Sequence, residues 1–138
     1  MMADAQGLLV AHGELAAALV DAAERIAGVS GVLVPISNVD CSPEILRDRI
    51  RAAREPGPTV IFVDMASGSC SFASLSLARE DRDIAVVTGV SLPMILDFLF
   101  HRDMELGPLA QRLVEKGRAS AAAHVASGVS HADQAVQD

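Results

Sequence analysis

His12 and Asp64 have the residue types of an activated nucleophile and the group that orients it. His12 ends the apolar run 7–11 and directly precedes Gly13, and Asp64 ends a second apolar run. If both runs are parallel strands, their carboxyl ends face one crevice, where the imidazole and the carboxylate would meet. A carboxylate that accepts the N–H of one ring nitrogen leaves the other nitrogen with a free lone pair, able to attack phosphorus. The pair therefore predicts a nucleophilic histidine, although a lone histidine at a strand end is often only a hydrogen-bonded structural residue.

The residues after Asp64 can supply an anion site. Residues 65–71 read Met-Ala-Ser-Gly-Ser-Cys-Ser, a turn that leaves a strand and enters a helix. The first N–H groups of a helix hold phosphate well, so Ser67, Gly68 and Ser69 are the candidate phosphate-binding residues. The alternative is that Ser67 or Ser69 only caps the helix. Phosphoryl transfer to a histidine needs mainly alignment and hydrogen-bond donors, so we expect neither a metal nor another cofactor.

Four short apolar runs, which predict strands, alternate with segments of helical period. The strands are expected at 6–11, 31–36, 58–64 and 84–90. A helix that ends at Gly28 should bury the stripe Leu15, Leu19, Ala22 and Ile26. A second, capped by Ser42 with Pro43 in its first turn, should bury Ile45, Leu46, Ile50 and Ala53. Later helices are expected from Pro93 to Phe100 and from Pro108 to about His124.

This alternation predicts an α/β fold, an open doubly wound and mainly parallel sheet with helices on both faces. Pro35 lacks a backbone N–H and is best placed in an edge strand. With the second strand at the edge, the sheet order is 2-1-3-4, and the switch point lies between the first and third strands, where His12 and Asp64 end. We expect one domain over residues 1–126. Small and polar residues over 127–138 offer little to bury and predict a poorly ordered tail.

The composition excludes several classes of partner. The 138 residues carry a net charge of -7 with Lys116 as the one lysine, which argues against nucleic acid and anionic membranes. The sequence lacks a disulfide framework, a signal peptide and an apolar run long enough to span a membrane, so a cytoplasmic location is expected. An acidic chain suits basic protein partners. The expected docking surface at the crevice rim comprises Gly13, Glu14, Met65 and Met94.

Three segments resemble the IIA domain of the mannose class of the bacterial phosphoenolpyruvate-dependent sugar phosphotransferase system. They are Val10-Ala11-His12-Gly13, Phe62-Val63-Asp64 followed by Gly68-Ser69, and Thr88-Gly89-Val90-Ser91-Leu92-Pro93-Met94. The last is the most specific and is similar to the family's Gly-Val-Asn-(Ile/Leu)-Pro-Met segment. The resemblance covers residues 7 to about 120.

The resemblance implies a phosphotransferase with His12 as the phosphorylated histidine, Asp64 as its orienting partner and Ser69 in contact with phosphate. It implies that HPr, a small histidine-phosphorylated carrier, donates the phosphoryl group and that a IIB domain or subunit accepts it. It also implies a homodimer that exchanges a strand, which would add a swapped edge strand to the sheet. Membrane contact would be indirect, through the transporter subunits.

The sequence departs from the family at the turn after the aspartate. Met65 replaces a usual threonine, and residues 66–70 replace Trp-Gly-Gly-Ser-Pro. Two relatives remain as alternatives: a regulatory protein that signals by its phosphorylation state, and the dihydroxyacetone kinase phosphocarrier, whose turn resembles Asp-Met-Gly-Ser. A receiver domain phosphorylated on Asp64 is disfavoured, because the first strand is not followed by an acidic pair. The apolar segment 91–100 suits either burial in its own subunit or a dimer interface.

Overall fold

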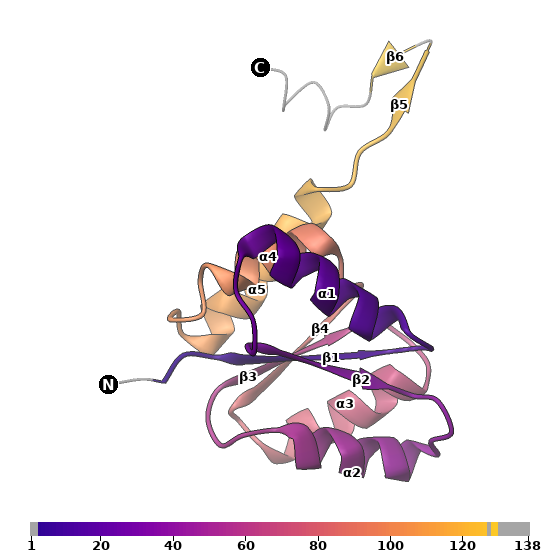
Figure 1. Cartoon of the computed structure of the whole chain (residues 1–138), viewed down its shortest axis with the longest axis vertical. Helices are drawn as coiled ribbons and strands as arrows, with labels where there is room; N and C mark the ends of the chain where they lie inside the picture. Colours follow the sequence, from indigo (N-terminus) through magenta and orange to yellow (C-terminus); the bar gives the residue numbers. More distant parts are fainter. Residues whose placement is uncertain (1–2, 127, 130–138) are drawn as a thin grey trace.

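A parallel sheet of four strands forms the centre of the molecule (Figure 1). This computed structural model describes residues 3–126 and 128–129. The strands are β1 (Gln6–Ala11), β2 (Leu33–Ser37), β3 (Thr59–Val63) and β4 (Ile84–Thr88), in the order β2-β1-β3-β4. The α/β class, the sheet order and the edge position of Pro35 in β2 are confirmed.

The two central strands are buried on both faces. Every residue of β3 is buried, and in β1 only Gln6 is partly exposed, which explains why these runs are apolar without alternation. The outer strands are shorter than predicted, because glycines bound them. Gly31, before β2, has a φ of 79°, and Gly89, after β4, has a φ of 72°. Both values lie in the left-handed region that glycine adopts without strain.

Helices cover both faces of the sheet, as expected from the doubly wound pattern (Figure 1). Helices α2 (Pro43–Ala53) and α3 (Ser69–Glu80) pack on one face, with Leu8 and Val10 of β1 beneath them. Helices α1 (Leu15–Ala27), α4 (Leu92–Leu99) and α5 (Leu106–Ala119) pack on the other, above Leu9 and Ala11. In the described residues no helix has both the length and the hydropathy to cross a membrane.

The ends of the first two helices agree with their sequence signals. Gly28 closes α1 with a φ of 72°. At the start of α2, the Ser42 side chain accepts a hydrogen bond from the Ile45 backbone N–H, with Pro43 in the first turn. The buried positions of α2 are Leu46 and Ile50, whereas Ile45 is half exposed.

The predicted buried stripe of α1 is wrong by one residue, which turns the helix by about 100°. Ala16, Val20 and Ala23 face the core, whereas Leu15 and Ile26 are 44% and 62% exposed. Of the predicted stripe, Leu19 and Ala22 are partly buried, and Leu19 packs against the core. The small alanines let the helix lie close to the sheet. The helical periodicity of the sequence instead predicted that the face with the larger leucine and isoleucine would be buried.

The apolar segment 91–100 is explained largely by burial in its own subunit. Met94, Ile95 and Phe98 of α4 are buried between the sheet and the neighbouring helices. Asp97 is also buried, and Arg112 of α5 donates two hydrogen bonds to its carboxylate, at 2.9 and 3.1 Å. This ion pair ties α4 to α5.

The carboxyl-terminal helix is shorter than predicted, because α5 ends at Ala119 and not near His124. The Ser120 backbone N–H and hydroxyl both donate to the Lys116 carbonyl and close the last turn. Strand β5 (His124–Val125) then pairs antiparallel with β6 (Gly128–Val129). This β5–β6 arm projects away from the sheet and helices (Figure 1). The predicted tail, 127–138, lies outside the described residues apart from β6.

Candidate functional site

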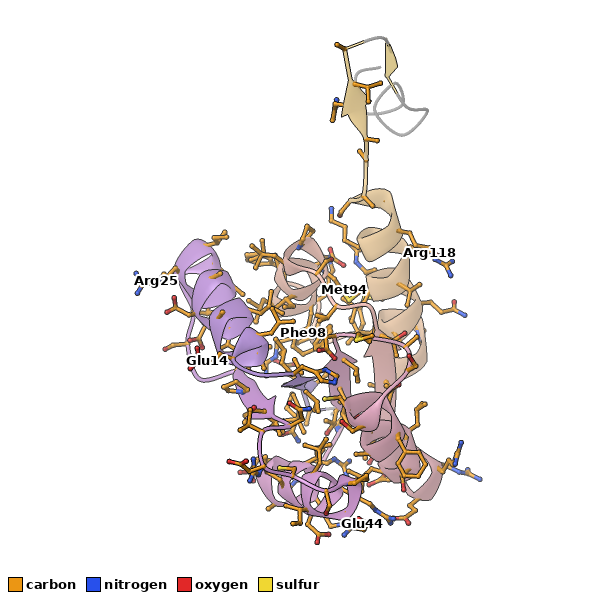
Figure 2. The ribbon with its side chains drawn as sticks, turned by 90° about the vertical axis from the view of Figure 1, so that its right-hand side faces the viewer. Glu14, Arg25, Glu44, Met94, Phe98 and Arg118 are labelled. Carbon is orange, nitrogen blue, oxygen red and sulfur yellow. The ribbon has the colours of Figure 1, made fainter. Side chains whose placement is uncertain are left out.

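The site lies at the carboxyl edge of the sheet, where β1 and β3 end side by side. Val10 of β1 pairs with Val63 of β3, so His12 and Asp64, which follow the two strands, emerge next to each other. Figure 2 looks onto this edge of the molecule, with Glu14 labelled at the start of α1. The structure thus brings together the two residues that strand order alone predicted to meet.

One carboxylate oxygen of Asp64 holds both the backbone and the ring of His12. Its Oδ2 accepts the His12 backbone N–H at 3.0 Å and lies 2.7 Å from the ring Nδ1. The other oxygen, Oδ1, accepts the Met65 backbone N–H at 3.0 Å. An ionised carboxylate can only accept, so Nδ1 carries the proton and Nε2 has the free lone pair. The arrangement fixes the tautomer that a nucleophilic histidine requires.

The environment keeps Asp64 ionised. Burial by itself raises the pKa of Asp64, but hydrogen bonds from the His12 backbone N–H and imidazole outweigh it and leave the pKa below its usual value. The Asp64 side chain is only 9% exposed, whereas that of His12 is 44% exposed. The carboxylate is therefore a fixed buried anchor, and the imidazole is open to a partner.

The backbone turn before α3 faces the Nε2 edge of the ring. A Cβ added to Gly68 would lie 3.8 Å from His12 Cε1 and 3.9 Å from Nε2. Gly68 has a φ of 101° and a ψ of -177°, a conformation that is essentially restricted to glycine. Gly68 therefore lies beside His12, and Ser67 and Ser69 are its neighbours in the chain; their predicted role in binding phosphate stays a prediction.

The amino terminus of α3 leaves N–H groups available to an anion. Neither Ser67 nor Ser69 caps the helix with its side chain, and the Phe72 N–H is the first to bond within it, to the Gly68 carbonyl. Within the described residues, the N–H groups of residues 69–71 have no acceptor. These donors and the positive end of the helix dipole can hold the oxygens of an anion.

Two residues that the sequence analysis missed position the turn after His12. The Gly13 backbone N–H donates to Asn38 Oδ1 at 3.2 Å, and the Ser37 hydroxyl donates to the Gly13 carbonyl at 2.7 Å. Both residues stand at the end of β2, the strand on the other side of β1. The strand-end argument that selected Asp64 also applies to them and could have found them.

Cys70 is a third residue of the site that the sequence analysis did not select. Its Sγ lies 3.8 Å from His12 Nδ1, and the residue is fully buried. Burial, with the nearby negative charge of Asp64, raises the pKa of the Cys70 thiol to about 11. The thiol is therefore protonated at neutral pH and is not a competing nucleophile.

Three of the four residues expected on the rim are exposed there. Gly13 and Glu14 are exposed and border a groove of about 360 Å³ between the start of α1 and the end of β2. The Met65 side chain is 53% exposed. Met94 is only 3% exposed and packs against Gly117 of α5, so its expected place on the rim is wrong. It stands in the first turn of α4, on the face turned toward the core.

Comparisons with known proteins agree on one family. The family model described as the fructose IIA component of the phosphotransferase system (EIIA-man) matches residues 7–114. The sorbose-specific EIIA component of Lacticaseibacillus casei is 33% identical over 116 residues, covering 78% of this chain and 82% of that protein.

Solved structures share the fold. EIIA from Streptococcus agalactiae superposes with a TM-score of 0.80 at 21% identity, covering 86% of this chain and 96% of its own. The mannose/sorbose-specific IIA subunit from Enterococcus faecalis superposes with a TM-score of 0.79 at 16% identity, covering 93% and 100%. At these identities the structures support the fold alone.

Proposed function

The chain belongs to the mannose-class IIA family of the phosphoenolpyruvate-dependent sugar phosphotransferase system and is a IIA phosphocarrier of the mannose/sorbose class; from this premise we propose that Nε2 of His12 is the atom that carries the phosphoryl group. The main support for this proposal is the 2.7 Å contact between Nδ1 of His12 and Oδ2 of Asp64. It leaves Nε2 as the one ring nitrogen with a lone pair to donate.

The transfer follows from this tautomer. The Nε2 lone pair attacks the phosphorus atom of phospho-HPr and forms an N–P bond. The bond from phosphorus to the donor imidazole breaks, and its electron pair stays on the donor. Positive charge develops on the His12 ring as the new bond forms, and the Asp64 carboxylate stabilises it through Nδ1–H. The same steps run in reverse toward a IIB domain.

We assign the phosphoryl oxygens to the turn at Ser67, Gly68 and Ser69. Gly68, which precedes α3, lies beside the ring edge that bears Nε2, and the N–H groups at the start of α3 have no acceptor within the described residues. The Ser67 and Ser69 hydroxyls stand on the same turn as additional donors. Fixed donors of this kind stabilise charge that develops on the oxygens during transfer.

Membership of the family implies HPr as donor and a IIB domain as acceptor in general terms. We place both partners, and the carrier itself, in the cytoplasm. Both partners must reach Nε2, so both dock over the rim formed by Gly13, Glu14 and Met65. The acidic Glu14 suits a basic partner face, and the exposed Met65 suits apolar contact at its centre.

Phosphorylation with phosphoenolpyruvate, enzyme I and HPr tests the assignment. We expect a mass gain of one phosphoryl group, located on the peptide that contains His12. Phosphorus NMR should identify the product as the Nε2 isomer, because Nδ1 is held by Asp64. A phosphoryl group on another residue, or on Nδ1, would contradict the proposed mechanism.

We also propose that the chain is a homodimer in which each β5–β6 arm lies on the partner subunit. The arm projects from its own subunit, and Val125 is 66% exposed. Among the residues that the structure describes, β4 pairs with β3 alone, so its other edge has unpaired backbone groups. A groove of about 390 Å³ runs along this edge, lined by Val86 and Val87 of β4 and by residues of α5. The arm of a second copy would pair with β4 and fill the groove.

Truncation after Ser120 should convert the dimer into a monomer, because it removes the arm. Analytical ultracentrifugation of the full-length and truncated chains at micromolar concentrations measures the change. Val125→Asp should weaken the dimer by placing a charge in the paired arm, whereas Val39→Asp, at a similarly exposed valine on the opposite edge of the sheet, should not. A full-length chain that sediments as a monomer would refute the exchange.

A further inference from the structure

The phosphorylation site contains a set of side chains that resembles a metal centre. His12 Nδ1, an Asp64 carboxylate oxygen and Cys70 Sγ all lie within 4.8 Å of one another. No other cluster of three or more such residues occurs in residues 3–126 and 128–129. Imidazole, carboxylate and thiol together favour Zn²⁺, whereas Mg²⁺ and Ca²⁺ prefer oxygen ligands alone.

Two of the three distances between the ligand atoms are close to those of a zinc site. Bond lengths of about 2.0–2.3 Å put the ligand atoms of a tetrahedral zinc ion roughly 3.3–3.6 Å apart. Here Nδ1 is 2.7 Å from Asp64 Oδ2 and 3.8 Å from Cys70 Sγ. The imidazole must move away from the carboxylate by less than about 1 Å to admit the ion. The His12 side chain is 44% exposed, so it has room to move and leaves a path to solvent.

Charge also favours an ion at this position. Binding releases the thiol proton, and the thiolate and the Asp64 carboxylate then neutralise the two charges of Zn²⁺. The charge of the ion offsets the burial and the Asp64 charge that otherwise keep the Cys70 thiol protonated.

We propose that His12, Asp64 and Cys70 bind Zn²⁺ and that the bound ion blocks phosphorylation. Zinc on Nδ1 displaces the proton that Asp64 holds there. The neutral ring then carries its proton on Nε2, and the lone pair that would attack phosphorus is lost. The blocking effect rests on the proposed role of Nε2, whereas the binding of zinc does not.

Zinc binding is tested on the untagged chain by competition with a chromogenic chelator. We expect one Zn²⁺ per wild-type chain and an affinity lower by more than about tenfold for Cys70→Ser. Cys41→Ser is the matched control, because it changes the other cysteine, which lies outside the cluster. It should bind as the wild type does. Equal affinity of the wild type and Cys70→Ser would overturn the site.

Blocking is tested separately, with purified phospho-HPr as donor so that zinc cannot act on enzyme I. Each variant is compared with itself, with and without one equivalent of Zn²⁺. Zinc should stop phosphoryl uptake by the wild type and by Cys41→Ser, and a chelator should restore it. Phosphoryl uptake by Cys70→Ser should continue in the presence of zinc. Zinc-loaded wild type that is phosphorylated at its normal rate would overturn the blocking effect. Zinc binding without phosphorylation of the zinc-free chain would instead count against the proposed role of His12.

Discussion

Replacing His12 with alanine should abolish phosphoryl uptake from phospho-HPr. The variant lacks the ring nitrogen that we propose carries the phosphoryl group, so transfer should fall by about 10⁴ or more, to below detection. The fold should survive, because the ring is 44% exposed and the Asp64 carboxylate keeps the backbone N–H groups of His12 and Met65 as donors. Intact-mass measurement over a time course with excess donor gives the result directly.

Two companion variants make this result specific. His12→Asn can still donate a hydrogen bond to Asp64 but has no nucleophilic nitrogen, so it should be as inactive as His12→Ala. His124→Ala changes a histidine on the projecting arm and should leave uptake within about twofold of the wild type. Undiminished labelling of His12→Ala would reject His12 as the phosphorylated residue.

Replacing Asp64 with asparagine should slow transfer by about 10² to 10⁴ without unfolding the chain. The asparagine amide can donate to Nδ1, which would make Nδ1 an acceptor and move the ring proton to Nε2. The ring would then present the wrong tautomer, and the positive charge that develops on it would lose its counter-charge. Quenched-flow measurement of transfer from phospho-HPr gives the rate, and nitrogen NMR of the imidazole gives the tautomer.

Asp40→Asn is the matched control for this substitution. Asp40 is exposed in the loop after β2 and has a φ of 58°, a conformation that asparagine also tolerates. The substitution Asp40→Asn removes one negative charge near the same edge of the sheet without touching the His12 ring. The rate of phosphoryl transfer should therefore change little. Equal rates for Asp64→Asn and the wild type would show that the carboxylate has no part in transfer.

The pairing of His12 with Asp64 was predictable because it depends on backbone order. Pro35 places its strand at the edge of the sheet, and the resulting order puts β1 beside β3. The ends of neighbouring parallel strands lie together, so His12 and Asp64 meet. The turn at Gly68 was also predictable, because a Ser-Gly-Ser segment follows the strand that ends at Asp64, but the φ of 101° at Gly68 was not.

The predictions that were wrong concern side-chain packing, which the periodicity of the sequence does not determine. Leu15 and Ile26 are larger than Ala16 and Ala23, yet the sheet accepts the alanine face because it allows a closer approach. Met94 has a side chain suited to a docking surface, but its position in α4 points it into the core. Ser37 and Asn38 contact the backbone of Gly13 and stand at the end of β2, so the strand-end argument that selected Asp64 applies to them as well.

Met65, which stands where the resemblance places a threonine, supports Asp64 through its backbone. The backbone N–H of Met65 donates to Asp64 Oδ1 at 3.0 Å, and any residue except proline can make this contact. The side chain points outward and is 53% exposed. The substitution therefore changes the surface that partners meet while preserving the support of the carboxylate.

If His12 carries the phosphoryl group, as we propose, the exposure of its ring affects how long the carrier can store that group. With 44% of the side chain exposed, the phosphoramidate would be open to water as well as to a protein acceptor. Spontaneous hydrolysis then competes with delivery, and a carrier without an acceptor slowly discharges. The phosphorylated fraction of the carrier therefore depends on the supply from the donor and on two routes of loss, delivery to the acceptor and hydrolysis. In the cell, the phosphorylated fraction would reflect the current flow of phosphoryl groups through the pathway and not the earlier supply.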